Sequence, residues 1–149
     1  MDVECLKPID ELVNNLDNQV ILGYGPYEHN NGQYKNYKLV ECAIMMSQPK
    51  HTFWNKYVIP SLKPIDECHN NPVSCTGPVF ITNNVEKYNK ENPDNRINIM
   101  EPIYFYPINN QMKSRVPDNL IKKTQEILRT RNFPKESYSV HYFDGSWIK

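Results

Sequence analysis

The chain has 149 residues, the length of one ordinary domain, which is enough for one hydrophobic core but not for two. Its 17 lysine and arginine residues equal its 17 aspartate and glutamate residues, so it lacks the basic excess of a nucleic-acid binder. No stretch reaches the roughly 20 apolar residues that cross a bilayer, and the first residues do not resemble a signal peptide. The sequence leaves the compartment unknown: as written, without a signal peptide or membrane segment, it is expected to be cytoplasmic, and no nucleic-acid partner is expected.

The four cysteines show no C-x-x-C pair. Cys68 and Cys75 are the closest two, and together with His69 they would still need a distant fourth ligand to hold zinc. This spacing disfavours zinc and favours free thiols. A short Cys68–Cys75 disulfide remains the alternative in an oxidising compartment.

The first half of the sequence alternates predicted helices and strands. Helical spacing of apolar residues predicts a helix over residues 9–16, and the apolar run of residues 19–27 predicts a buried strand that ends at two glycines. A polar loop follows, and residues 37–47 are apolar enough for a second strand. Residues 51–62 carry a helical stripe predicted to face the core, although Pro60 interrupts its last turn. The stripe consists of Phe53, Trp54, Tyr57, Val58 and Leu62.

The second half continues the mixture. Thr76 is placed to cap a helix whose first turn contains Pro78, where the missing N–H costs nothing. Residues 97–108 are rich in β-branched and aromatic side chains and predict a strand. Residues 117–131 form the clearest predicted helix, and residues 138–143 alternate as in a strand. That helix is expected to be capped by Asp118 or Asn119 and to turn Leu120, Ile121, Ile127 and Leu128 toward the core.

This order of elements indicates an α/β fold, with a sheet covered by helices, in one domain or part of one. Near its end the chain places an imidazole, a hydroxyl and an indole within seven residues, at His141, Ser146 and Trp147. Taken singly, each has an ordinary structural explanation: a hydrogen-bonded histidine, a Gly-Ser turn and an aromatic anchor. Asp2 and Glu4 would likewise be solvated carboxylates.

The combination is more specific, because the start of the chain resembles a known motif. In glycosyltransferases of the DXD-containing sugar-binding-region family (glycosyltransferase family 32), a Gly-Gly-x-Tyr-x-Asp-x-Asp strand runs into a Val-x-x-Leu-Lys-Pro-Asp-like segment. The stretch MDVECLKPIDEL resembles the end of that motif, with Asp2 at the second aspartate. The residues that match the segment after this aspartate are Val3, Leu6, Lys7, Pro8 and Asp10.

Three more segments keep the order of that family along nearly the whole chain. CAIMMSQPKHTF (residues 42–53) resembles its Asn-Ala-x-x-x-(Ala/Ser)-x-Pro-x-His-Pro-Phe segment, and TGPVFIT (residues 76–82) resembles its Thr-Gly-Pro-x-x-x-Thr. SVHYFDGSW (residues 139–147) resembles the closing His-(His)-x-x-x-Ser-Trp. The departures are Cys42 for Asn, Thr52 for Pro and Tyr142 for the second His.

The resemblance implies a retaining, metal-dependent, hexosyltransferase-like enzyme that transfers a sugar from a UDP- or GDP-sugar to a glycan or other acceptor. It implies Asp2 and His141 as ligands of a divalent metal, manganese in preference to magnesium. Ser146 and Trp147 would bind the substrate, since a hydroxyl and an indole N–H donate to a diphosphate without adding negative charge. The resemblance does not place a catalytic nucleophile.

The family has a GT-A fold, a Rossmann-like sheet whose N-terminal half binds the nucleotide and supplies the first aspartate. Met1 directly precedes the residue that matches the second aspartate. Residues 1–149 are therefore expected to be the C-terminal part of one catalytic domain, a partial GT-A fold lacking its nucleotide-binding half, which would be separate or missing. The alternative is a catalytically inactive relative that acts as a sugar-binding or interaction module.

This expectation predicts the genomic sequence upstream of Met1. An aspartate codon should directly precede the Met1 codon, with a Gly-Gly-x-Tyr-like stretch a few codons earlier, in the same frame or after one frameshift. The physical reason is that a single carboxylate supplies too few charged oxygens to hold a divalent ion against water. A stop codon with no Asp-x-Asp remnant in any frame would contradict the expectation and favour the inactive relative.

Overall fold

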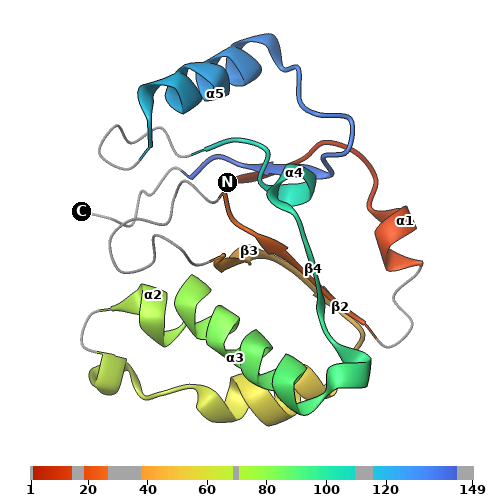
Figure 1. The fold of residues 1–149 in the computed structure, drawn as a ribbon, viewed down its shortest axis with the longest axis vertical. Helices are drawn as coiled ribbons and strands as arrows, with labels where there is room; N and C mark the ends of the chain where they lie inside the picture. Colours follow the sequence, from red (N-terminus) through yellow and green to blue (C-terminus); the bar gives the residue numbers. More distant parts are fainter. Residues whose placement is uncertain (1, 15–18, 27–37, 69–70, 110–115, 144–149) are drawn as a thin grey trace. The chain divides into compact units, whose positions relative to one another are not determined.

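The computed structural model describes residues 2–14, 19–26, 38–68, 71–109 and 116–143, which are the coloured parts of Figure 1. The chain forms two compact units. The terminal unit comprises Met1–Ile9, Tyr24–Lys38 and Glu101–Lys149, and the central unit comprises Asp10–Gly23 and Leu39–Met100.

A three-stranded sheet organises the central unit, in the order β3-β2-β4. The strands are β2 (Val20–Tyr24), β3 (Val40–Ser47) and β4 (Asn98–Met100), and β2 runs parallel to β4 with Leu22 opposite Ile99. Leu22 is fully buried, as expected for an apolar run in a middle strand that is covered on both faces. The strands predicted within residues 19–27 and 37–47 are confirmed.

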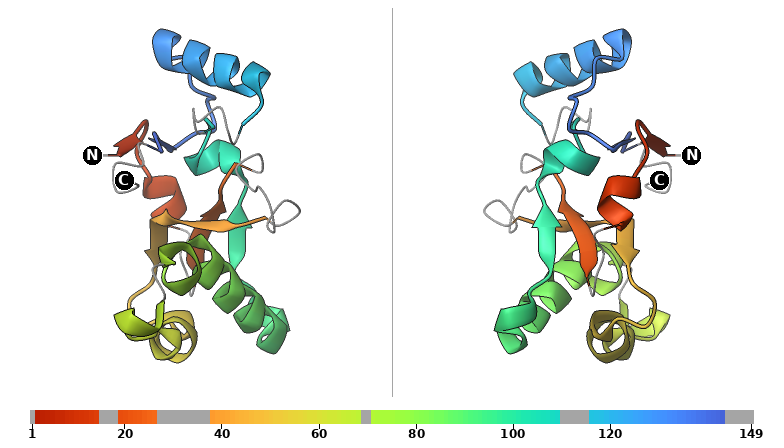
Figure 2. Two further views of the ribbon diagram at one scale, coloured as in Figure 1. Left: turned by 90° about the vertical axis from the view of Figure 1, so that its left-hand side faces the viewer. Right: turned by 90° about the vertical axis from the view of Figure 1, so that its right-hand side faces the viewer.

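Helix α3 (Pro78–Glu91) packs against β3 and against the wide π-helical turn η3 (Phe53–Val58), as the views in Figure 2 show. Thr82 joins α3 to β3, because its Oγ1 accepts the Val40 N–H at 2.8 Å and donates to the Pro78 carbonyl at 2.7 Å. The short helix α1 (Asp10–Val13) begins the central unit, where sequence periodicity predicted a helix.

The predicted helix over residues 51–62 is only partly correct. Regular winding continues from η3 into a single 3-10 turn, η4 (Ile59–Ser61), because Pro60 has no N–H to extend a helix. Phe53 and Val58 are buried as predicted, but Leu62 is 49% exposed and does not belong to the core.

The predicted cap of α3 is wrong in one residue. Pro78 does occupy the first turn, but Gly77 is the N-cap, and the Thr76 hydroxyl instead donates to the Pro72 carbonyl at 3.4 Å. Steric crowding explains why residue 77 is glycine, since a Cβ there would lie 2.9 Å from the Pro72 oxygen. The close approach of the preceding helix α2 (Pro72–Cys75) therefore requires glycine at this position.

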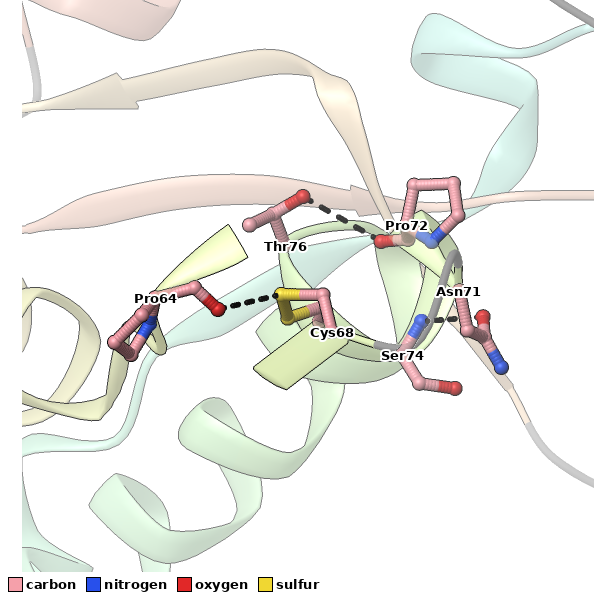
Figure 3. The surroundings of a disulfide bond; sticks show 7 residues. Pro64, Cys68, Asn71, Pro72, Ser74 and Thr76 are labelled. Atoms are coloured by element: carbon pink, nitrogen blue, oxygen red, sulfur yellow. Dashed lines mark hydrogen bonds between the residues drawn. A yellow bond between two sulfur atoms is a disulfide. The ribbon is translucent and has the colours of Figure 1, made fainter. Parts of the chain in front are cut away.

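A disulfide joins Cys68, at the end of the 3-10 helix η5 (Ile65–Cys68), to Cys75 in α2 (Figure 3). Its Cα atoms lie 5.5 Å apart, the usual separation for a disulfide. Free thiols were the favoured expectation for this pair, and that expectation is wrong; Cys5 and Cys42 are the free cysteines. Asn71 caps α2 inside the closed loop, with its Oδ1 accepting the Ser74 N–H at 3.2 Å.

The terminal unit contains a two-stranded antiparallel ladder of β1 (Val3–Cys5) and β5 (Ser139–His141). Its helices are α4 (Pro102–Phe105) and α5 (Asp118–Thr130). The strand predicted over residues 97–108 ends at Met100, because Pro102 cannot donate to a ladder and instead begins α4. In α5, Ile121 is buried as predicted, but neither Asp118 nor Asn119 caps the helix, since Pro117 is the N-cap.

Residues in β5 and just before it bind three carbonyls of α4. The Ser137 hydroxyl donates to the Ile103 carbonyl at 2.6 Å, and the Ser139 hydroxyl donates to the Phe105 carbonyl at 3.2 Å. Between them, the Tyr138 N–H donates to a third α4 carbonyl. These bonds satisfy carbonyls that have no partner within such a short helix, and they place β5 against α4.

Replacing both Cys68 and Cys75 by serine should lower the free energy of unfolding by about 2–3 kcal/mol, because the crosslink closes a loop that restricts the unfolded chain. Urea unfolding of oxidised protein would measure the change. The double variant Cys5→Ser/Cys42→Ser is the control, since neither residue is crosslinked. Four titratable thiols in unreduced protein would contradict the disulfide.

Candidate functional site

The β1–β5 ladder brings the two ends of the described chain together. Val3 pairs with His141, Glu4 with Val140 and Cys5 with Ser139. Backbone hydrogen bonds extend the pairing beyond both strand ends: the Tyr142 N–H donates to the Asp2 carbonyl at 2.8 Å, and the Leu6 N–H donates to the Tyr138 carbonyl at 2.9 Å. Candidate ligands from opposite ends of the sequence are thus neighbours in space.

Asp2 and His141 are in direct contact. His141 Nε2 lies 3.0 Å from Asp2 Oδ2, and the two side chains are 15% and 38% exposed, respectively. Both predicted metal ligands therefore lie at one end of one ladder. Their role as ligands remains a prediction.

The environment of His141 favours the neutral imidazole. Its ring packs edge-on against Phe143 and Tyr106, with centroid distances of 4.2 and 6.0 Å. Burial lowers the pKa of His141 from its ordinary 6.5, and the neighbouring Asp2 charge only partly opposes this. A neutral imidazole is the form that binds a metal ion.

The hydrogen bonds of His141 also indicate its tautomer. A carboxylate only accepts hydrogen bonds, so Nε2 carries the proton that faces Asp2. Nδ1 is buried, and no group within the described part of the chain hydrogen-bonds to it. To bind an ion through Nε2, His141 must therefore exchange the Asp2-facing proton for the metal.

The spacing of the pair suits two adjacent ligands of one ion. Two neighbouring ligands of an octahedral ion, each about 2.1 Å from it, lie about 3.0 Å apart. The separation of His141 Nε2 and Asp2 Oδ2 is also 3.0 Å. This spacing matches that of octahedral ligands and equally that of an ordinary hydrogen bond, and the described residues contain no group of three or more His, Cys, Asp or Glu side chains arranged around an ion.

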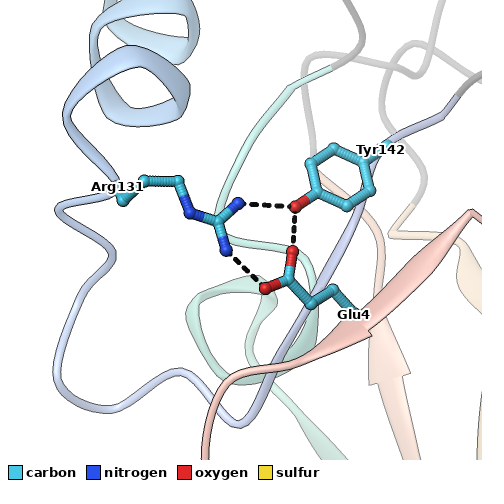
Figure 4. Close-up of polar contacts among 3 residues, drawn as sticks. All are labelled: Glu4, Arg131 and Tyr142. Carbon is cyan, nitrogen blue, oxygen red and sulfur yellow. Dashed lines mark hydrogen bonds and ion pairs between the residues drawn. The ribbon is translucent and has the colours of Figure 1, made fainter.

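A second polar cluster lies on the same ladder (Figure 4). Arg131 Nη2 forms an ion pair with Glu4 Oε1, and the Tyr142 hydroxyl donates to Glu4 Oε2. Arg131 Nη1 also donates to the Tyr142 oxygen at 2.9 Å, so the three side chains close a ring of hydrogen bonds. The Glu4–Arg131–Tyr142 cluster thereby links β1, the residue after β5 and the end of α5.

The cluster shifts the titration of its members. The Arg131 hydrogen bond, followed by that of Tyr142, lowers the pKa of Glu4 below its ordinary 4.5. The Glu4 hydrogen bond raises the pKa of Arg131, and burial followed by the Glu4 hydrogen bond raises the pKa of Tyr142. Glu4 and Arg131 are consequently charged, and Tyr142 neutral, across the physiological pH range.

A cavity of about 420 Å³ adjoins the cluster. Basic side chains from Lys7, Arg131 and Lys135 line it together with Glu4. Lys7 is held in place, since its ammonium donates to the Lys135 carbonyl at 2.9 Å and lies 4.0 Å from the centre of the Tyr138 ring. The cavity wall is therefore more basic than acidic.

The other predicted site residues divide into two groups. Ser146 and Trp147 lie outside the described residues. The two motif segments of the central unit have structural functions: buried His51 accepts the Phe53 N–H on Nδ1 at 3.1 Å, and Gly77 allows α2 to approach the start of α3. Those segments therefore shape helix starts in the central unit.

Sequence reasoning missed the Glu4–Arg131–Tyr142 cluster. Glu4 was expected to be solvated, Tyr142 was assigned to the last predicted strand and noted as a departure from the family pattern, and Arg131 was the last residue of a predicted helix. Arg131 and Glu4 are 127 positions apart, so no local spacing could have paired them. Only the pairing of β1 with β5 brings these side chains together.

One half-buried carboxyl in the central unit is also unusual. Burial raises the pKa of Glu41, in β3, to about 7. The Cys42 thiol beside it also has a raised pKa, first through burial and then through the Glu41 charge. A carboxyl with such a pKa can exchange protons at neutral pH, but the described residues around it do not form a second cluster of ligands.

No protein family, curated protein or solved structure matches this chain with significant similarity. The resemblance to family 32 glycosyltransferases therefore rests on the sequence motifs alone. Within the described residues, no helix has both the length and the apolar character to span a membrane.

The carboxyl of Glu4, followed by NMR during an acid titration, should show a pKa below 4.5, because Arg131 stabilises its charged form. The contribution of charged Glu4 to the stability of the fold is complete at pH values above its ordinary pKa of 4.5. It is lost as the pH falls through the lowered pKa. Arg131→Met should raise this pKa more than Tyr142→Phe does, since the Arg131 hydrogen bond is the larger cause. An unshifted Glu4 in the unsubstituted protein would show that the cluster does not form in solution.

Proposed function

We propose that this chain is part of a retaining, metal-dependent glycosyltransferase that uses a nucleotide-diphosphate sugar, a UDP- or GDP-sugar, as donor and a glycan or other molecule as acceptor. The observation that supports the proposal best is the contact between Asp2 and His141. By the family resemblance, the sequence motifs assign both residues to one metal site. Their side chains lie within 3.0 Å of each other.

The proposed roles follow from the chemistry of the side chains. Asp2 provides a carboxylate oxygen, and His141 provides an imidazole nitrogen that is held in orientation by Phe143 and Tyr106. A bound divalent ion, manganese in preference to magnesium, would neutralise charge that develops on the diphosphate as the sugar leaves. By the family resemblance, Ser146 and Trp147 would donate hydrogen bonds to the same diphosphate.

The described residues supply only part of such a site. One carboxylate and one neutral imidazole contribute two ligands and a single negative charge. A hard divalent ion prefers about six ligands, most of them oxygen atoms. The diphosphate, water and the first aspartate of an Asp-x-Asp motif would complete the coordination. The proposal therefore requires metal binding and donor binding to be coupled.

The alternative is a catalytically inactive relative that binds a sugar or a partner protein. It is favoured by the small number of ligands, because no set of three ligating side chains is assembled among the described residues. Such a relative would retain the Asp2–His141 contact as an ordinary hydrogen bond. The two proposals differ in whether nucleotide binding depends on a metal.

The disulfide bears on where the protein functions. Cys68 and Cys75 are joined, and crosslinks of this kind persist in oxidising compartments and are rare in the reducing cytoplasm. We therefore favour an oxidising compartment over the cytoplasmic location that the sequence suggested. Thiol counting on protein isolated from its native host, with rapid alkylation, would test this preference.

In protein reconstituted with the nucleotide-binding half of the domain, the metal proposal predicts that Mn²⁺ binds in the presence of UDP or GDP and that Asp2→Asn weakens this binding at least about tenfold, because an amide is a poorer ligand than a carboxylate. His141→Gln should act in the same direction. Electron paramagnetic resonance of free Mn²⁺ would measure both affinities.

Asp94→Asn is the matched control, since Asp94 is an exposed carboxylate of the central unit. Its Mn²⁺ affinity should equal that of the unsubstituted protein. Nucleotide binding that is independent of metal, or equal affinities in Asp2→Asn and Asp94→Asn, would reject the metal site and favour the inactive relative.

A further inference from the structure

We propose that Glu4, Arg131 and Tyr142 are positioning residues, which set the register of the β1–β5 ladder and thereby hold Asp2 beside His141. The functional meaning of that spacing rests on the proposed metal site. The effect on the register is a separate, structural claim. The two claims can therefore fail independently.

The ladder needs such a constraint because it is short. Its strands pair over three residues each, and β1 exposes Cys5 at one end. A slip by one residue would turn every side chain of β1 to the opposite face, and a slip by two would move Asp2 by about 6.6 Å along the strand. Either change would separate Asp2 from His141.

Side chains on one face of the ladder distinguish the observed register from its neighbours. Glu4 pairs with Val140, and Tyr142 lies two residues beyond Val140, so the side chains of Glu4 and Tyr142 project from the same face. Tyr142 is bonded through its N–H to the Asp2 carbonyl, which places it diagonally from Glu4 across the two chains. The Tyr142 hydroxyl reaches Glu4 from that diagonal position, and a slip in either direction would lengthen or break the bond.

Arg131 adds a fixed point outside the ladder. It ends α5 in the left-handed region, with φ 57° and ψ 21°, a conformation that side-chain-bearing residues rarely adopt. From there its guanidinium binds Glu4 with one nitrogen and Tyr142 with the other. A planar guanidinium holds two partners in one geometry. Arg131 therefore joins Glu4 in β1 and Tyr142 after β5 to the end of α5.

The same contacts exclude Glu4 from the proposed metal site. Its Oε1 is bound to Arg131, and its Oε2 accepts the Tyr142 hydroxyl. The cluster thus gives the carboxylate of Glu4 in β1 and that of Asp2 just before the strand different functions: Glu4 maintains the register, and Asp2 contacts His141.

The test compares Tyr142→Phe with Tyr57→Phe by amide hydrogen exchange in metal-free protein. Tyr142→Phe keeps the ring and removes only the hydroxyl, and the Tyr142 amide, which bonds the Asp2 carbonyl, should then exchange about 2- to 10-fold faster. Tyr57→Phe removes a comparable Tyr–Glu hydrogen bond in the central unit, where Tyr57 donates to Glu91 at 2.8 Å. It should leave that amide unchanged.

The second readout is the affinity for Mn²⁺ in the presence of UDP or GDP. Loss of a group that orients a ligand typically weakens metal binding by about 10-fold or more, so Tyr142→Phe and Arg131→Met should both do so. Arg131→Lys keeps the charge but not the planar fork, and it should restore part of the affinity that Arg131→Met loses. This partial restoration also guards against a general loss of folding.

Unchanged amide exchange in Tyr142→Phe would overturn the proposal, whatever happens to the metal affinity. Faster exchange with no Mn²⁺ binding by the unsubstituted protein would support the positioning of the ladder and reject the proposed function. Faster exchange with unchanged Mn²⁺ affinity would overturn the link between register and metal binding. Equal effects of Tyr142→Phe and Tyr57→Phe would show that the contribution is general stability, and would also overturn the proposal.

Discussion

The terminal unit depends on the antiparallel pairing of β1 with β5. This pairing closes a loop of nearly the whole chain, so Glu4 and Tyr142 hydrogen-bond although they are 138 positions apart in sequence. Closing so long a loop is entropically unfavourable, and three residue pairs contribute few backbone hydrogen bonds in return. Additional contacts come from α4, whose carbonyls bind Ser137 and Ser139, and from the Glu4–Arg131–Tyr142 cluster.

Two residues with positive φ flank the candidate site. Arg131 has φ 57° and Phe143 has φ 52°, and a side-chain-bearing residue in this region costs about 1–2 kcal/mol. Both residues make contacts that require their position: Arg131 binds Glu4, and Phe143 packs against the His141 imidazole at 4.2 Å. Unfavourable backbone geometry that is retained beside a cluster of ionisable groups is a common feature of functional sites.

The central unit gains its stability in a different way. An aromatic cluster forms its interior, with the Tyr88 ring 5.7 Å from that of Phe53 and 5.1 Å from that of Tyr57. Thr82 joins α3 to β3, and the Cys68–Cys75 disulfide restrains the segment that precedes α3. The motif residues His51 and Gly77 belong to this framework, so part of the family resemblance reflects folding requirements and part reflects the residues of the β1–β5 ladder.

The sequence by itself determined the elements with strong local signals: the buried strand β2, the amphipathic helix α5 and the start of α3 at Pro78. It also singled out Asp2 and His141, through the motifs. It misjudged residues 97–108, where Pro102 overrides a high β propensity, and it favoured free thiols at Cys68 and Cys75. Only the tertiary structure decided which distant residues meet, because contacts such as Arg131 with Glu4 follow from strand register and helix ends, which leave no periodic trace in the sequence.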